Sequence, residues 1–338
     1  MKINKNIFLH QLVIFLLFLF ISCENNESET EGCPMFDIVP SSPYNDPIWH
    51  PSGEIIGFNH IPIKEIHYTY GFDCPHQATY IYDKDSAGFW LINADGTNQR
   101  RVLSYTLTTP AWSSNGDWIA FSQGAQIFKM PFDGNQFDTT AIEQLTFEGR
   151  NFFPTWSPDG EWIAYDSDVD SPTGLKFIWK MKSNGLSKKR IAFTPNDGET
   201  RMPFWGNDFK IVHIRYVGIG SSEIFEMDSS GNNIIRITEN EDMDQYPKYS
   251  PHDKFICYIS QSQSSDGTQL WRFDNKENEF KQLTTSGALN FSWSPGGKIV
   301  YLKFDYSRID ETKGTLWVMD ADRNNKQQLT YNNFQIIQ

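Results

Sequence analysis

Short apolar runs recur along the chain, each bounded by turn-forming residues. The runs are 55–58, 118–121, 162–165, 211–214, 255–258 and 299–302. Runs this short, rich in Ile, Val, Phe and Tyr, are typical of β-strands buried on both faces. Tight turns precede them, most clearly at 157–160 and 294–297, where Pro presets φ and Gly supplies positive φ. The pattern predicts an all-β fold.

The runs belong to a longer repeat that is anchored on aromatic residues. The anchors are Trp49, Trp112, Trp156, Trp205, Tyr249 and Trp293, with gaps of 63, 44, 49, 44 and 44 residues. A proline stands two residues before each anchor except the last, where Phe291 takes its place. A period of about 40–50 residues with four short strands per unit is typical of propeller blades. We therefore predict a six-bladed β-propeller with four-stranded antiparallel blades.

The repeat resembles that of the TolB-like propellers. In that family Pro-x-Trp-Ser-Pro-Asp-Gly is followed by Ile-Ala-Phe, a Met-Asp strand and Leu-Thr, and segments 154–165 and 318–330 here are similar. The resemblance covers roughly residues 46–331, and we assign 46–338 to one propeller domain. It implies that the propeller docks other proteins, as TolB-like scaffolds often do. It does not name a ligand, since one fold carries many functions.

The amino terminus predicts export. Lys2 and Lys5 precede an apolar run that ends Leu-Phe-Ile-Ser-Cys at residues 19–23, so residues 1–22 are expected to be a signal peptide. The sequence around Cys23 resembles a bacterial lipobox, which implies lipidation of Cys23 and an outer-membrane lipoprotein facing the periplasm or the cell surface. Secretion without lipid and an uncleaved anchor are the alternatives. Residues 23–45 would form a polar, acidic tether and an N-terminal arm.

Charge and cysteine content narrow the partners further. The chain has 29 basic and 42 acidic residues, and loss of Lys2 and Lys5 would make the exported form still more acidic. Such a surface disfavours nucleic acid. In an oxidising envelope Cys33 and Cys74 could form a disulfide that ties the arm to the first blade. Cys257 lies within a predicted strand and is expected to be a buried free thiol.

Candidate site residues lie where the chain enters each first strand. The loops between second and third strands, about 59–87, 166–176, 216–222, 260–268 and 304–314, gather with the inter-blade connectors on one face. Loops on a rigid scaffold commonly carry function. Polar residues at the channel mouth are the candidates for ligand binding: Asp46, Arg150, Asn151, Arg201, Asp244, Gln245 and Asn290. Alternatively, they satisfy backbone groups and hold channel water.

No metal or other cofactor is expected. His60, His67, Asp73, Cys74 and His76 lie close in sequence, but without the spacing of a structural zinc motif. Asp166, Asp168 and Asp170 alternate as in a calcium loop, yet Ser171 stands where such a loop needs Gly. We assign no catalytic residue, since no Gly-x-Ser-x-Gly elbow is present. Oligogalacturonate lyase-like propellers hold a metal with several channel histidines, and here the later blades offer only His213 and His252.

These observations favour a non-catalytic binding module for an envelope protein or glycan, which would dock on the loop-rich face. The alternative is a carbohydrate-active enzyme, a lyase or hydrolase, with paired carboxylates at the channel mouth. We also expect residues 334–337, which follow the last Leu-Thr, to run alongside the start of the first blade and latch the two ends of the chain together.

Overall fold

The computed structural model describes residues 42–70, 75–191, 198–262, 267–304 and 313–337. Regular structure in these ranges is almost entirely β-strand, with two short 3-10 turns at Thr139–Ala141 and Pro251–Asp253, and the all-β prediction is confirmed. None of the described residues belongs to a helix with the length and apolarity that a bilayer crossing needs. The proposed signal peptide, Cys23, Cys33 and Cys74 all lie outside the described residues.

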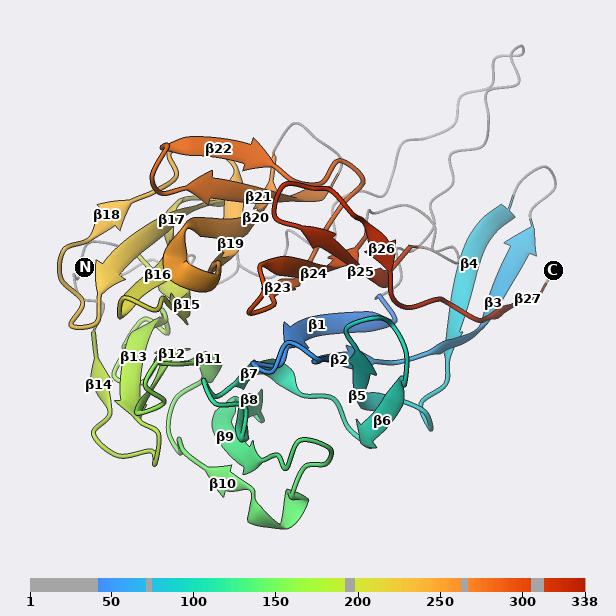
Figure 1. Cartoon of the computed structure of the whole chain (residues 1–338), viewed down its shortest axis with the longest axis horizontal. Coiled ribbons are helices and arrows are strands. Elements are labelled where there is room, and N and C mark those ends of the chain that lie inside the picture. Colours follow the sequence, from blue (N-terminus) through green and yellow to red (C-terminus); the bar gives the residue numbers. More distant parts are fainter. Residues whose placement is uncertain (1–41, 71–74, 192–197, 263–266, 305–312, 338) are drawn as a thin grey trace, which may run out of the picture. The chain divides into compact units, whose positions relative to one another are not determined.

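The strands form successive groups of four, which we call blades one to six (Figure 1). Blade one contains β1 (Tyr44–Trp49), β2 (Ile55–His60), β5 (Gly88–Asn93) and β6 (Arg100–Leu103). Blade two contains β7 (Thr108–Trp112), β8 (Trp118–Gln123), β9 (Gln126–Pro131) and β10 (Glu143–Gln144). Blade three contains β11 (Asn151–Trp156), β12 (Trp162–Ser167), β13 (Phe177–Lys182) and β14 (Lys189–Arg190).

The second half of the chain repeats this order. Blade four contains β15 (Thr200–Trp205), β16 (Lys210–Gly218), β17 (Ser221–Asp228) and β18 (Ile235–Arg236). Blade five contains β19 (Met243–Tyr249), β20 (Phe255–Gln261), β21 (Thr268–Asp274) and β22 (Glu279–Gln282). Blade six contains β23 (Phe291–Trp293), β24 (Lys298–Lys303), β25 (Thr315–Asp320) and β26 (Gln327–Gln328).

Pairing within each blade is antiparallel, as predicted. Blades four and five are joined into one eight-stranded sheet by a single parallel pair, Ser222 with Met243. This pair is one contact between two four-stranded groups, so the arrangement is consistent with six blades. The predicted loop at 216–222 is a continuation of the β16–β17 hairpin, because both strands extend outward to a turn at residues 219–220.

The hydrophobic core lies between neighbouring blades. The described residues form six buried clusters, and each cluster spans two adjacent blades. In one of them Ile56 and Phe58 of blade one pack with Val300 and Leu302 of blade six, which closes the ring. Both faces of each second strand are therefore buried. Because successive side chains point to opposite faces, the sequence of these strands is a continuous apolar run.

Glycines in the turns between third and fourth strands also join the blades. Gly96, Gly185 and Gly231 all have positive φ and face the residue at the Leu-Thr position of the preceding blade. A Cβ atom on these glycines would lie 3.5 Å from Leu329 O, 3.2 Å from Leu145 O and 1.6 Å from Ile191 O, respectively. Glycine is thus required at the tightest of these junctions by both backbone conformation and close packing.

The first blade carries an extra hairpin, and the chain ends against it. The hairpin consists of β3 (Ile63–Tyr70) and β4 (Pro75–Tyr82), and β27 (Gln335–Ile337) pairs with β3 in parallel. Phe334 packs on the cluster between blades six and one. The carboxyl end therefore does latch onto blade one, but at this hairpin and not at β1. β1 is an edge strand, but its residues line the channel. β3 has an edge away from the channel, and β27 pairs with it there.

Candidate functional site

The first strands of the six blades surround a channel cavity of about 250 Å³. Two positions of each repeat supply half of its lining residues. The residues one place before the aromatic anchors all line the cavity, and they are Ile48, Ala111, Thr155, Phe204, Lys248 and Ser292. The residues three places before the anchors also line it in five blades, and they are Asp46, Thr109, Phe153, Tyr246 and Asn290. The Pro-x-Trp repeat thus encodes the channel as well as the core.

A bulge interrupts the first strand of every blade that has the repeat proline. In these five blades the residue before proline has positive φ, between 48° and 55°, and the strand register shifts at this point. Proline has no N–H to donate to the ladder and disfavours right-handed helical geometry in the residue before it, so the hydrogen-bond ladder is interrupted there. Blade six lacks the proline, and β23 pairs with β24 without a shift.

Asp46 and Lys248 bring opposite charges to the channel wall. Asp46 accepts hydrogen bonds from Asn59 Nδ2 at 3.0 Å and from Asn290 Nδ2 at 3.3 Å. Lys248 donates to the carbonyl of Phe291 in blade six. Burial raises the pKa of Asp46 to about 6, against the opposing effects of Asn59 and Lys248. Burial also lowers the pKa of Lys248 to about 8, and Asp46 opposes that shift.

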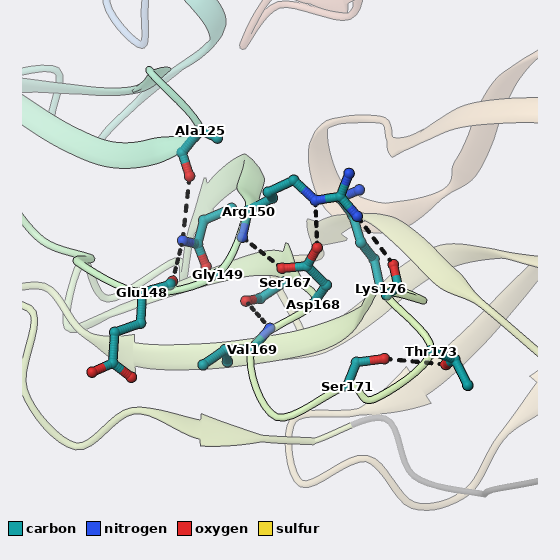
Figure 2. Close-up of polar contacts among 12 residues, drawn as sticks. Ala125, Glu148, Gly149, Arg150, Ser167, Asp168, Val169, Ser171, Thr173 and Lys176 are labelled. Atoms are coloured by element: carbon teal, nitrogen blue, oxygen red, sulfur yellow. Dashed lines mark hydrogen bonds and ion pairs between the residues drawn. The ribbon is translucent and has the colours of Figure 1, made fainter.

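Arg150 fixes the connector before blade three to the loop after β12 (Figure 2). The Arg150 backbone N–H donates to Asp168 Oδ1 at 2.6 Å, and its Nε donates to Asp168 Oδ2 at 2.5 Å. A second guanidinium nitrogen reaches the carbonyl of Gly174 at 3.4 Å. Gly149 allows this approach, because a Cβ atom there would lie 2.9 Å from Val169 N. The predicted candidate Arg150 therefore preorganises the loop-rich face.

Arg201 and Asp166 form a second ion pair, which joins blades three and four. Arg201 Nε lies 3.4 Å from Asp166 Oδ2 and 3.8 Å from Glu199 Oε1. Asp166 is fully buried, accepts from the Met202 N–H at 3.3 Å, and leaves its Oδ1 atom without a hydrogen-bond partner. Burial raises the pKa of Asp166 to about 6, although Arg201 stabilises the carboxylate. The pair connects the second strand of blade three to the bulge of blade four.

The remaining predicted candidates do not line the cavity. Asn151 is buried and donates to the carbonyl of Glu148 at 2.9 Å. Asp244 is fully buried and accepts from Asn240 Nδ2 at 3.1 Å, and burial raises its pKa. Gln245 is half-buried in β19. Of the seven candidates the structure therefore brings only Asp46 and Asn290 together in the channel.

The potential metal ligands are engaged elsewhere. Among the described residues no group of three or more His, Cys, Asp or Glu side chains is placed to hold a metal ion. Asp166 and Asp168 point to different arginines. His60 hydrogen-bonds to the carbonyl of Pro43 and is buried, which lowers its pKa to about 4. Asp73 and Cys74 lie outside the described residues.

Sequence reasoning missed Lys248 and the aromatic part of the wall, Phe153, Phe204 and Tyr246. The signal was available in the register of the repeat, because these residues stand one or three places before an anchor. Cys257 is a buried free thiol, as predicted.

Comparison with solved structures places this fold among propellers. A TolB from Acinetobacter baumannii is 22% identical with a TM-score of 0.59, over 73% of this chain and 62% of that protein, so this chain spans less than two thirds of its length. A putative TolB from Agrobacterium tumefaciens is 20% identical with a TM-score of 0.57, over 71% of this chain and 84% of that protein. An oligogalacturonate lyase in complex with manganese is 10% identical with a TM-score of 0.52, over 84% and 76% of the two chains.

Sequence comparison gives the family. A search of curated protein sequences returned no match. The family described as the TolB beta propeller domain matches residues 77–338, which is well over half of the chain. The propeller described above therefore belongs to the TolB beta propeller domain family.

Proposed function

We propose that this propeller is a non-catalytic binding module that docks a protein partner of the bacterial envelope on its loop-rich face. The observation that carries the proposal is a set of exposed apolar side chains in the connector before blade three, the β12–β13 loop and the end of the β16–β17 hairpin: Phe147, Leu175, Val217 and Ile219. We call this set the apolar rim. Large apolar side chains that are exposed to solvent supply the apolar contacts of protein–protein interfaces.

Ile219 is the most prominent member of the rim. It is fully exposed at the turn of the β16–β17 hairpin, between Gly218 and Gly220. The Ile219 side chain contributes nothing to the protein's own core. Its burial lowers the free energy only when a partner covers it. The links from Arg150 to Asp168 and from Arg201 to Asp166 hold the neighbouring backbone in place, which lowers the entropic cost of docking.

Crosslinking in intact envelopes, followed by mass spectrometry, tests the docking surface. Wild-type protein is expected to capture one reproducible protein partner, and the double variant Val217→Ser with Ile219→Ser is expected to reduce that capture at least tenfold. The matched control is Leu186→Ser with Phe209→Ser. It removes two exposed apolar side chains from the face opposite the rim, in the β13–β14 and β15–β16 turns. Equal losses in both double variants, or capture of a glycan alone, would contradict the proposal.

The same proposal includes the lipid anchor predicted at Cys23. We expect Cys23→Ser to move the protein from the membrane fraction to the soluble fraction of the envelope, because one acyl-bearing thiol would be lost. Fractionation with blotting measures this shift, and Ser22→Ala serves as the control. A Cys23→Ser protein that remains with the membrane would refute the anchor while leaving the docking surface open to its own test.

An enzymatic function has less support. The likeness to an oligogalacturonate lyase, at 10% identity, concerns the fold alone. His213, the histidine of blade four, is buried in β16 with its Nδ1 on the carbonyl of Ile214. Turnover of acidic or neutral oligosaccharides by the purified protein would favour the enzyme.

A further inference from the structure

The channel wall is divided into a polar and an apolar sector. Asp46 of blade one and Lys248 of blade five flank blade six, whose two wall positions are the small polar residues Asn290 and Ser292. These four side chains make the polar sector. Among the twelve residues at the two wall positions of the six repeats, Asp46 and Lys248 are the only charged ones. Their opposite signs therefore face one cavity from two sides of the same blade.

The opposite wall is mainly apolar, although Thr109 and Thr155 add two hydroxyl groups to it. Blades three and four contribute Phe153 and Phe204, and blade two contributes Ala111. Tyr246 of blade five adds a further ring beside Lys248. A ligand that fits this cavity must present charged groups toward blade six and an apolar group toward blades three and four, because an unmatched polar group against the rings would lose its hydration.

Both charged groups retain unused hydrogen-bonding capacity. An ammonium has three donors and a carboxylate has about four acceptor sites. Lys248 uses one donor on the Phe291 carbonyl, and Asp46 uses two acceptor sites on Asn59 and Asn290. Within 4.0 Å these two described side chains form no ion pair with each other, although each affects the titration of the other. A ligand can therefore bridge them without breaking an existing ion pair.

We infer that the channel binds a small zwitterion with an apolar side chain, of the class of the aliphatic α-amino acids. Its ammonium would lie at Asp46, its carboxylate at Lys248, and its side chain against Phe153 and Phe204. A cavity of about 250 Å³ is close to the lower end of the range for small-molecule sites, roughly 300–1,000 Å³, which suits a ligand of this size. This site is separate from the apolar rim, so it does not depend on a protein partner.

The pH dependence of binding follows from the two wall charges. Asp46 is ionised above its raised pKa of about 6, and Lys248 is protonated below its lowered pKa of about 8. Tyr246 also faces this sector, and burial raises its pKa, so it stays neutral across this window. Both charges needed by the zwitterion coexist only between these values. Affinity is expected to be greatest near pH 7 and to fall on either side.

Isothermal titration with L-leucine, N-acetyl-L-leucine and L-leucinamide tests the site on the whole exported chain. L-leucine is expected to bind at pH 7, and each blocked analogue, which lacks one of the two charges, is expected to bind at least tenfold more weakly. Asp46→Asn and Lys248→Met should each reduce affinity for L-leucine at least tenfold. Lys189→Met, at an exposed lysine on the outer edge of blade three, is the control and should bind as the wild type does.

Two results with the wild-type protein would refute the zwitterion site. If wild-type protein does not bind L-leucine, or binds either blocked analogue as tightly, the zwitterion site is refuted without the use of any variant. Melting curves of the two channel variants show whether they fold. A variant that does not fold leaves the analogue series and the pH profile of the wild type as the deciding measurements.

Discussion

Replacing Gly231 by Ala is expected to lower the free energy of unfolding by about 3–5 kcal/mol, one of the largest effects that a single methyl group can have in this protein. Gly231 has a φ of +89°, which costs an L-residue about 1–2 kcal/mol. The new Cβ atom would also lie 1.6 Å from the carbonyl oxygen of Ile191. Backbone cannot rotate away as a side chain can, so the junction between blades three and four must open.

Gly134→Ala separates these two causes. Gly134 occupies the corresponding turn of blade two with a φ of +94°, but a Cβ atom there would meet nothing within 4 Å. It is expected to cost only the conformational part, about 1–2 kcal/mol. Denaturant unfolding of both variants measures the difference. Similar losses would mean that the close approach to Ile191 is unimportant for stability.

Replacing Asp166 by Asn is expected to stabilise the protein, by up to about 3 kcal/mol at neutral pH. The carboxyl is fully buried, and its pKa is raised from 3.8 to about 6, a shift of about two pKa units at 1.36 kcal/mol each. Because the folded pKa is the higher one, the wild type loses stability as pH rises from about 4 to about 6. Asn keeps an acceptor for the Met202 N–H and carries no charge, so the variant should not show that loss.

The measurement is the free energy of unfolding of both proteins from pH 4 to pH 8. The gain from Asp166→Asn should be near zero at pH 4 and complete above pH 6. Asp228→Asn provides a control of opposite sign, since hydrogen bonds from Ser230 and Asn232 lower the pKa of Asp228 to about 2. That variant should be less stable than the wild type at neutral pH, with the deficit shrinking in acid. A destabilised Asp166→Asn would show that the charge on Asp166 is needed by Arg201.

The repeat was enough to predict the architecture because each unit has the same local sequence pattern. The proline, the anchor, the turn and the apolar run recur in register, and together they specify strand, reversal and buried strand. The bulge before each proline was not predicted, although proline cannot complete a ladder. Its position follows from how β1 and its equivalents pair with the next strand, and this is a tertiary property.

The candidate site was harder to predict for a similar reason. Arg150 and Arg201 do not line the cavity, and each forms an ion pair inside the chain, with Asp168 and Asp166 respectively. Partners that lie 18 and 35 residues away along the chain cannot be predicted from residue type alone, and neither can the burial of Asp244. Lys248 was recognisable only by counting back from Tyr249, since a lone lysine in a strand ordinarily points to solvent. The predicted disulfide of Cys33 with Cys74 stays a prediction, because neither residue is described.

The close approach of Gly96 to Leu329 has a consequence for the order of the blades along the chain. This contact joins the last blade to the first by the same geometry that Gly185 and Gly231 use at two interior junctions. The Tyr44 hydroxyl also donates to the carbonyl of Tyr331 at 3.1 Å, so the beginning and the end of the ring meet. A circularly permuted chain, linked here and opened at another connector, would preserve all six clusters between adjacent blades. These contacts therefore do not require any particular blade to come first along the chain.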